Sequence, residues 1–165
     1  MKCHFLWQDC PAALWVFTDS DWAGCTKSRK STSGGVATYG GHWLGHWSRT
    51  QPTIALSSGE AELNASNMGG SEGLGLKNIV KDLGEPTELV ILEDSSASIG
   101  IGSREGTGRI KHLEARQLWV QEKVTNGDMT LKKIPRKINF SDCLTHHWTE
   151  PETSRFFPAL GFEFV

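Results

Sequence analysis

Short apolar and β-prone runs separated by turn residues occupy the first third of the chain. These runs predict strands at residues 14–19, 34–41 and 42–50. The last two runs meet at Gly40 and Gly41, a turn signal that is typical of an antiparallel hairpin. The pattern therefore predicts three strands that follow one another as a meander.

A longer segment, residues 59–84, repeats its apolar residues with a helical period instead. Ser57 or Ser58 is a suitable N-cap, and Glu60 and Glu62 lie in the first turns, where the helix dipole favours negative charge. Four glycines fall inside the pattern: Gly69, Gly70, Gly73 and Gly75. Each costs about 1 kcal/mol relative to alanine. Close packing against a sheet and a locally weak helix both remain open as explanations.

The remaining sequence alternates between the two periods. It predicts a strand at residues 88–93, a short helix at 95–104, a helix at 112–124, a strand at 129–134 and a final helix that begins at Ser141. This order of elements is typical of an α/β protein with a mixed sheet. A chain of 165 residues fits one domain with a substantial core.

Four acidic residues stand at the ends of these elements. Asp19 and Asp94 end two apolar runs, Glu62 lies near a helix start and Asp142 lies at the start of the last predicted helix. If folding brings them together, their charges repel one another and raise the pKa values of the group. Carboxylate oxygens suit Mg²⁺ or Mn²⁺, so the sequence predicts a metal-dependent phosphoryl-transfer site.

The acidic residues lie in five sequence blocks that occur in order: VFTDSDWAGCTKSRKSTSGG, QPTIALSSGEAEL, ELVILEDSSASIGI, GRIKHLEARQLWVQEKV and KIPRKINFSDCLTH. Together these blocks resemble the ribonuclease H domain of copia-type LTR retrotransposon polyproteins, over roughly residues 14–148. The resemblance implies a ribonuclease H-like α/β fold, with a five-stranded mixed sheet of three antiparallel strands followed by two parallel ones, flanked by helices. It also implies a domain at residues 14–150, a remnant of a connecting segment at 1–13 and a C-terminal tail at 151–165.

The resemblance further implies hydrolysis of the RNA strand of an RNA–DNA hybrid with two Mg²⁺ ions, for which Mn²⁺ can substitute. Asp19 would bridge the ions, Glu62 and Asp94 would complete the shell of one, and Asp142 would hold the other. No small-molecule cofactor is expected. The expected partners are the hybrid duplex and a reverse transcriptase domain of the parent polyprotein.

Three neighbouring acids compete for these roles: Asp21, Glu60 and Glu93. Asp21 lies further along the strand than Asp19 and is expected at the surface or behind the ligands. On a helix Glu60 points about 200° away from Glu62, and on a strand Glu93 faces away from Asp94. The family motifs favour Glu62 and Asp94.

The block around Asp142 departs from the family pattern, because it reads NFSD where NPAD is common. Many ribonucleases H also carry a histidine in the loop ahead of this aspartate. Here that loop offers Arg136 and Lys137 and no histidine, so the auxiliary role is either absent or taken by a cation. Trp22 and Trp148 lie close to acidic positions and are candidates for the wall of the site.

The formal net charge of −2 conceals a segregation of charge. Residues 22–59 contain four basic residues and no acidic one, which leaves basic surface for phosphates. A hybrid duplex exposes the 2′-hydroxyls of its RNA strand in a wide minor groove. We therefore expect Ser20 and Ser31 to contact the substrate, and Arg29 and Lys30 to bind its phosphates.

Other classes of protein fit the sequence less well. It has no signal-peptide pattern and no apolar run near the roughly 20 residues that cross a bilayer, so we expect a reduced, intracellular protein without a membrane segment. Cys143 with His146 and His147 lacks the partner ligands of a zinc site. Two rivals stay open. One is an inactive hybrid-binding or structural module with the same fold, and the other is a nuclease of the transposase or integrase type.

Overall fold

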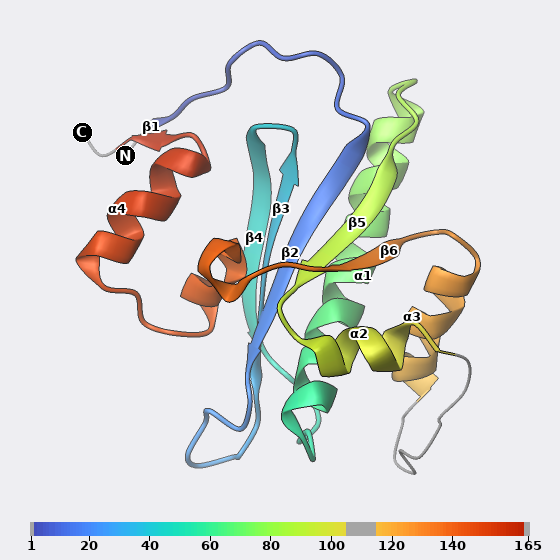
Figure 1. Ribbon diagram of the computed structural model, residues 1–165, viewed down its shortest axis with the longest axis vertical. Helices are drawn as coiled ribbons and strands as arrows, with labels where there is room; N and C mark the ends of the chain where they lie inside the picture. The colour runs from blue at the N-terminus through green and yellow to red at the C-terminus, as the bar shows by residue number, and fades with distance from the viewer. Residues whose placement is uncertain (1, 105–114, 164–165) are drawn as a thin grey trace.

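A computed structural model describes residues 2–104 and 115–163 of the chain. Its centre is a five-stranded sheet with the order β4-β3-β2-β5-β6 (Figure 1). The strands are β2 (Ala13–Asp21), β3 (Thr32–Tyr39), β4 (His42–Thr50), β5 (Glu88–Glu93) and β6 (Thr130–Lys133). Strands β2, β3 and β4 pair antiparallel, whereas β5 pairs parallel with both β2 and β6. The predicted mixed sheet is therefore confirmed.

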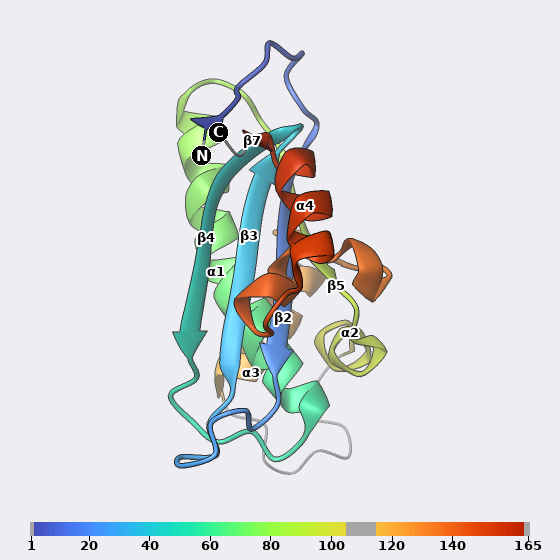
Figure 2. The same ribbon diagram turned by 90° about the vertical axis from the view of Figure 1, so that its left-hand side faces the viewer.

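Helices cover both faces of this sheet. They are α1 (Ser58–Asp82), α2 (Ser96–Gly102), α3 (Ala115–Thr125) and α4 (Glu150–Ala159), with two short 3-10 helices, η1 (Arg136–Ile138) and η2 (Phe140–Leu144). The long helix α1 lies on one face of the sheet and α4 on the other (Figure 2). The first residues of the helix predicted at 112–124 lie outside the described part of the chain.

The helix predicted to begin at Ser141 is wrong. That residue belongs to η2, a five-residue 3-10 helix, and the C-terminal α-helix begins only at Glu150. The intervening Thr-His-His-Trp-Thr sequence consists of weak helix formers. In addition, Thr145 and Trp148 direct their side chains to acidic residues, which holds the segment in an irregular path.

The glycines of α1 allow this helix to pack closely on the sheet. A Cβ atom at Gly69 would lie 2.4 Å from Thr18 Cγ2, and one at Gly73 would lie 2.6 Å from Leu89 Cδ1. Both distances are too short for any side chain, so close packing explains these positions. Gly75 differs, since a Cβ atom there would meet open space.

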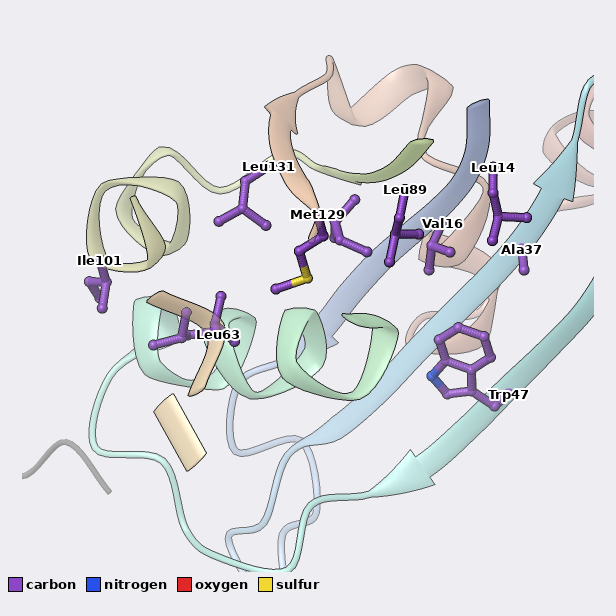
Figure 3. Packing of buried hydrophobic residues seen from close by; sticks show 11 residues of the cluster. Leu14, Val16, Ala37, Trp47, Leu63, Leu89, Ile101, Met129 and Leu131 are labelled. Carbon is purple, nitrogen blue, oxygen red and sulfur yellow. The ribbon is translucent and has the colours of Figure 1, made fainter. Parts of the chain in front are cut away.

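Two apolar clusters hold the sheet between its helices. The larger lies between α1 and the sheet and includes Leu14, Val16, Leu63, Leu89 and Ile91, all of them at most 1% exposed (Figure 3). The smaller lies on the opposite face, where Phe17, Val36, Val90, Leu92 and Ile134 pack with residues of η2 and of the segment after α4. Burial of side chains of this size contributes about 1.5–3 kcal/mol each. The central strands are therefore fixed from both sides.

The two ends of the described chain meet away from this core. Strand β1 (Lys2–Cys3) pairs antiparallel with β7 (Phe162–Glu163), and His4 Nε2 lies 2.8 Å from Glu163 Oε2. Segments predicted as the connecting remnant and the C-terminal tail thus contact each other. The domain boundaries at residues 14 and 150 stay predictions.

Within the described residues, none of the helices combines the length and the apolar character that a bilayer crossing requires.

Candidate functional site

Strand register brings the first two acidic residues together. The parallel pairing of β2 with β5 places Phe17 opposite Leu92. Continued by two residues, this register brings Asp19 level with Asp94. Both then lie on the face of the sheet that carries Phe17 and Leu92, opposite α1.

Glu62 approaches the same point from the second turn of α1. Oxygens of Asp19, Glu62 and Asp94 lie within 4.8 Å of one another. Burial, followed by repulsion from Asp19 and Asp94, raises the pKa of Glu62 to about 9, while a hydrogen bond from the Ser20 backbone acts in the opposite direction. Its Oε2 atom is buried without a hydrogen-bond partner among the described residues. A buried, unpartnered oxygen in a group of acids is a strong reason to expect a cation.

Asp19 belongs to this group and also to a second group, which is formed around Asp142. We call Asp19, Glu62, Asp94 and Asp142 together the acidic centre. Asp19 is 4% exposed, and burial raises its pKa to about 6, with repulsion from Asp142 and Asp94 adding to the rise. The Thr145 hydroxyl donates a hydrogen bond to Asp19 Oδ2, which lowers the pKa in part. This contact also ties the end of β2 to the segment that follows η2.

Asp142 is held by side chains on both of its carboxylate oxygens. Arg136 donates to Oδ1 from Nη2 at 2.9 Å and from Nε at 3.0 Å, and Trp148 Nε1 donates to Oδ2 at 3.0 Å. The Trp148 ring in turn stacks on Phe156 of α4, with ring centroids 4.3 Å apart. The sequence made Trp148 a candidate for the wall of the site, and in the structure its indole N–H also orients the Asp142 carboxylate.

A second group of ligand atoms forms around Asp142. Atoms of Asp19, Asp142 and His146 lie within 4.8 Å of one another, and His146 is exposed at the rim. The sequence analysis missed His146 as a site residue because it sought a histidine ahead of Asp142. The spacing of four residues after Asp142 was the available signal, and the His146 backbone N–H donates to the Asp142 carbonyl at 2.9 Å.

The competing acids have other roles. Asp21 accepts a hydrogen bond from the Thr32 backbone, and Glu60 accepts one from the Leu56 backbone at 2.8 Å, close to the start of α1. Glu93 is fully buried on the α1 face, where Ser66 donates to it at 2.9 Å. Burial raises the pKa of Glu93 to about 7, although hydrogen bonding opposes the rise.

The predicted substrate contacts are unequal in exposure. Arg29 is exposed and Lys30 partly exposed, both in the loop between β2 and β3. Ser20 is buried beside Asp19, and its hydroxyl has no hydrogen-bond partner within the described residues. Ser31 is fully buried, and its Oγ accepts a hydrogen bond from Ala23 N at 3.0 Å. In this structure Ser31 therefore stabilises the loop rather than presenting its hydroxyl at the surface.

The donor atoms of the site fit a hard divalent cation. Four carboxylates and one imidazole form two groups that share Asp19, which is suited to Mg²⁺ or Mn²⁺. Cys143 does not join them: burial raises its thiol pKa to about 11, and its Sγ donates to the Phe140 carbonyl at 3.3 Å. A protonated thiol of this kind is a poor zinc ligand.

Comparisons with known proteins agree with this geometry. Over 131 residues the chain is 34% identical to the retrovirus-related Pol polyprotein from transposon TNT 1-94 of Nicotiana tabacum. The match covers 78% of the chain, which spans only 10% of that polyprotein. By sequence, the chain is therefore related to a segment of retrotransposon Pol polyproteins. The predicted resemblance is thereby confirmed.

Solved structures show that the fold of the chain is ribonuclease H-like. An RNase H1 isolated from compost by a metagenomic approach superposes with a TM-score of 0.57 at 18% identity, over 81% of this chain and 92% of that one. The same enzyme in complex with an RNA/DNA hybrid gives a TM-score of 0.55 at 17% identity, over 79% and 92%. No family model matches the chain.

Proposed function

We propose that this ribonuclease H-like domain is a metal-dependent endonuclease that hydrolyses the RNA strand of RNA–DNA hybrids. One observation supports the proposal above the others: carboxylates from β2, α1, η2 and the position directly after β5 converge into two groups that share Asp19. Bringing buried carboxylates together is unfavourable, because their charges repel one another and lose hydration. Acids that only cap helices or lie at the surface are not expected to converge in this way. The Pol relatives and the fold of the RNase H1 structures support the same class of activity.

The carboxylates would hold two divalent ions in the arrangement that the sequence predicted. Asp19, Glu62 and Asp94 would hold one ion, and Asp19 with Asp142 would hold the other. His146, which the sequence did not predict, would be a further ligand of the second ion. Bound ions of this kind supply activation of water and neutralisation of charge on the leaving oxygen.

The chain itself supplies the positions of these ligands. Thr145 fixes one oxygen of Asp19, while Arg136 and Trp148 fix both oxygens of Asp142. Hydrogen bonds of this kind orient ligating carboxylates and contribute to metal affinity. His146 lies at the exposed rim of the group that contains Asp142. This places a histidine after Asp142, where the family carries one before it.

Recognition of the hybrid is proposed to depend on its shape. Arg29 and Lys30 remain our candidates for phosphate contacts, and Ser20 remains one for the RNA strand because its hydroxyl is unpaired beside Asp19. Ser31 is the weakest candidate, since its hydroxyl is already bonded. We also infer a reverse transcriptase domain as a partner, because the relatives are Pol polyproteins.

A cleavage assay tests the proposal. Labelled RNA–DNA hybrid is incubated with the protein and Mg²⁺ or Mn²⁺, alongside Asp19→Asn and the control Asp82→Asn, which removes an exposed carboxylate at the far end of α1. We expect cleavage of the RNA strand by the wild type and by Asp82→Asn, but not by Asp19→Asn. Double-stranded DNA and double-stranded RNA of the same sequence should stay intact.

Three results would contradict the proposal in different ways. Binding of hybrid without cleavage under any ion condition would favour an inactive module. Cleavage confined to double-stranded DNA would favour a nuclease of the transposase or integrase type. Undiminished cleavage by Asp19→Asn would show that the acidic centre is not the catalytic site.

A further inference from the structure

A pocket next to the acidic centre contains residues to which the proposed function gives no role, among them Lys137 and Arg155. It has a volume of about 630 Å³ and lies between η1, η2 and α4, with Asp142 in its wall. This volume is in the usual range for ligand sites, about 300–1,000 Å³. Because Asp142 belongs to both, the pocket and the acidic centre are continuous.

The lining of the pocket combines cations with aromatic rings. Arg136, Lys137 and Arg155 bring positive charge, while Trp148 and Phe156 provide flat apolar surface. Guanidinium and ammonium groups suit phosphate, and aromatic faces suit bases or sugars. The chemistry therefore matches a nucleic-acid strand better than a small apolar ligand.

Two of the three cations are free for a ligand. Arg136 is engaged with Asp142, but within residues 2–104 and 115–163 neither Lys137 nor Arg155 makes an ion pair. Both side chains belong to exposed residues. The acid of the lining, Glu152, is used locally, since its Oε2 accepts hydrogen bonds from Thr149 N at 2.8 Å and Thr149 Oγ1 at 2.7 Å.

The aromatic wall is rigid and connected to the site. Phe156 is buried, stacks against the Trp148 ring and lies 5.4 Å from the Arg155 guanidinium, measured to its ring centroid. Trp148 also donates a hydrogen bond to Asp142, so its ring connects Phe156 of α4 to the acidic centre. A strand seated in this pocket would be held in a fixed position relative to the site.

We propose that this pocket is a strand-binding subsite, which takes the phosphate backbone of the hybrid where it continues past the acidic centre. Lys137 and Arg155 bind phosphate, and the Trp148 ring, backed by Phe156, supports the adjoining sugar or base. The inference rests on the proposed function, because it assumes that a hybrid lies across the acidic centre. It assigns the C-terminal helix a role in substrate affinity.

The affinity for hybrid without catalysis tests this subsite. Fluorescence anisotropy with a labelled hybrid is measured in EDTA at low ionic strength for the wild type and the double variant Lys137→Ala with Arg155→Ala. We expect the Kd to rise roughly tenfold, and the slope of log Kd against log salt concentration to become shallower by about one for each phosphate left without its cation. Only a small loss of thermal stability should accompany the weaker binding, because both residues are exposed, although Arg155→Ala removes the contact of the guanidinium with the Phe156 ring.

Matched variants separate this subsite from a general effect of charge. The variant Lys137→Arg with Arg155→Lys keeps both charges and should bind within about twofold of the wild type, because the affinity for phosphates depends mainly on charge. Lys81→Ala, at the far end of α1, removes an exposed charge remote from the pocket and should not change the Kd. A double alanine variant that binds as tightly as Lys81→Ala would overturn the subsite.

The outcome also distinguishes this inference from the proposed function. If the double alanine variant binds more weakly but the wild type never cuts hybrid, the subsite is supported and the proposed nuclease activity is contradicted. If the wild type cuts hybrid but all variants bind equally well, the nuclease activity is supported and the subsite is contradicted. A wild type that binds no hybrid at all overturns the subsite as well.

Discussion

The two halves of the acidic centre are built in different ways. Asp19 stands on β2 and Asp94 directly follows the neighbouring strand β5, and both strands are packed on both faces. Glu62 stands on α1, which packs closely on that sheet. Asp142 instead lies on a five-residue 3-10 helix and depends on Arg136 and Trp148 for its orientation.

We call Asp19, Glu62 and Asp94 the strand half of the acidic centre, and Asp142 with His146 the C-terminal half. The two halves owe their geometry to different interactions. The strand half inherits its geometry from main-chain register and core packing, which a single surface substitution hardly changes. The C-terminal half inherits its geometry from a few side-chain hydrogen bonds and from the stacking of Trp148 on Phe156. We therefore expect the strand half to be robust and the C-terminal half to be adjustable.

The largest expected effect comes from the residue common to both groups of ligand atoms. Asp19→Asn should lower the rate of hybrid cleavage roughly a thousandfold or more, equivalent to about 4 kcal/mol of transition-state stabilisation. Calorimetric titration with Mn²⁺ should show neither of the two binding events. Asp142→Asn is the comparison, since it should abolish only one event, and equal ion stoichiometry in the two variants would contradict a shared ligand.

A second prediction concerns pH in the absence of metal. The folded state raises the pKa of Asp19 to about 6, of Glu93 to about 7 and of Glu62 to about 9, so it binds more protons than the unfolded chain does. Stability should therefore fall as the pH rises from about 4 to about 9. Each pKa unit is worth about 1.4 kcal/mol, so we expect a loss of several kcal/mol in the free energy of unfolding between pH 5 and pH 8.

Thermal unfolding in EDTA at several pH values measures this loss. Glu62→Gln should flatten the dependence on pH, and Mn²⁺ added at pH 8 should restore stability because it replaces the missing protons. Stability that rises from pH 5 to pH 8 without metal would contradict the predicted sign.

A third prediction tests the close packing of α1 on the sheet. Gly69→Ala places a methyl group 2.4 Å from Thr18 Cγ2, so the helix must shift, at a cost of about 2 kcal/mol in the free energy of unfolding. Gly75→Ala is the matched control, because the new methyl group meets open space and should stabilise the helix by up to about 1 kcal/mol. Urea unfolding compares the two, and equal effects of the same sign would refute the packing argument.

The smallest expected effect comes from the indole donor of the C-terminal half. Trp148→Phe keeps a ring against Phe156 but removes the hydrogen bond to Asp142 Oδ2. The affinity for the second Mn²⁺ should fall roughly tenfold, with little change in thermal stability. Trp22→Phe is the control, since it removes an indole donor that bonds the Ala55 carbonyl instead of an acid. Disappearance of the first, tighter binding event in Trp148→Phe would argue against this division between the halves.

The strand half of the site was accessible from sequence because it rests on periodic elements. Asp19 and Asp94 end apolar runs, and parallel strands carry such ends to one edge of the sheet. The helical period allowed only one of Glu60 and Glu62 to face the site, and the family motif favoured Glu62. In the structure Glu60 bonds the Leu56 backbone near the helix start. The explanation for the glycines of α1 needed coordinates, because only they show what a side chain would strike.

The C-terminal half was less accessible because no periodic pattern encodes it. The helix predicted from Ser141 is a short 3-10 helix, and His146 enters the site only through the irregular chain that follows. The burial of Ser31 is likewise set by the path of its loop, where its hydroxyl bonds Ala23 N. Side-chain contacts between distant segments leave little trace in local sequence.

The pairing of β1 with β7 has a mechanical consequence. Lys2 lies opposite Glu163 and Cys3 opposite Phe162, so both ends of the described chain depart from one small antiparallel ribbon. Tension applied at the two ends would peel this ribbon apart one residue pair at a time before any load reached the central strands. Optical-tweezer extension should accordingly record a weak early yield that leaves the acidic centre folded.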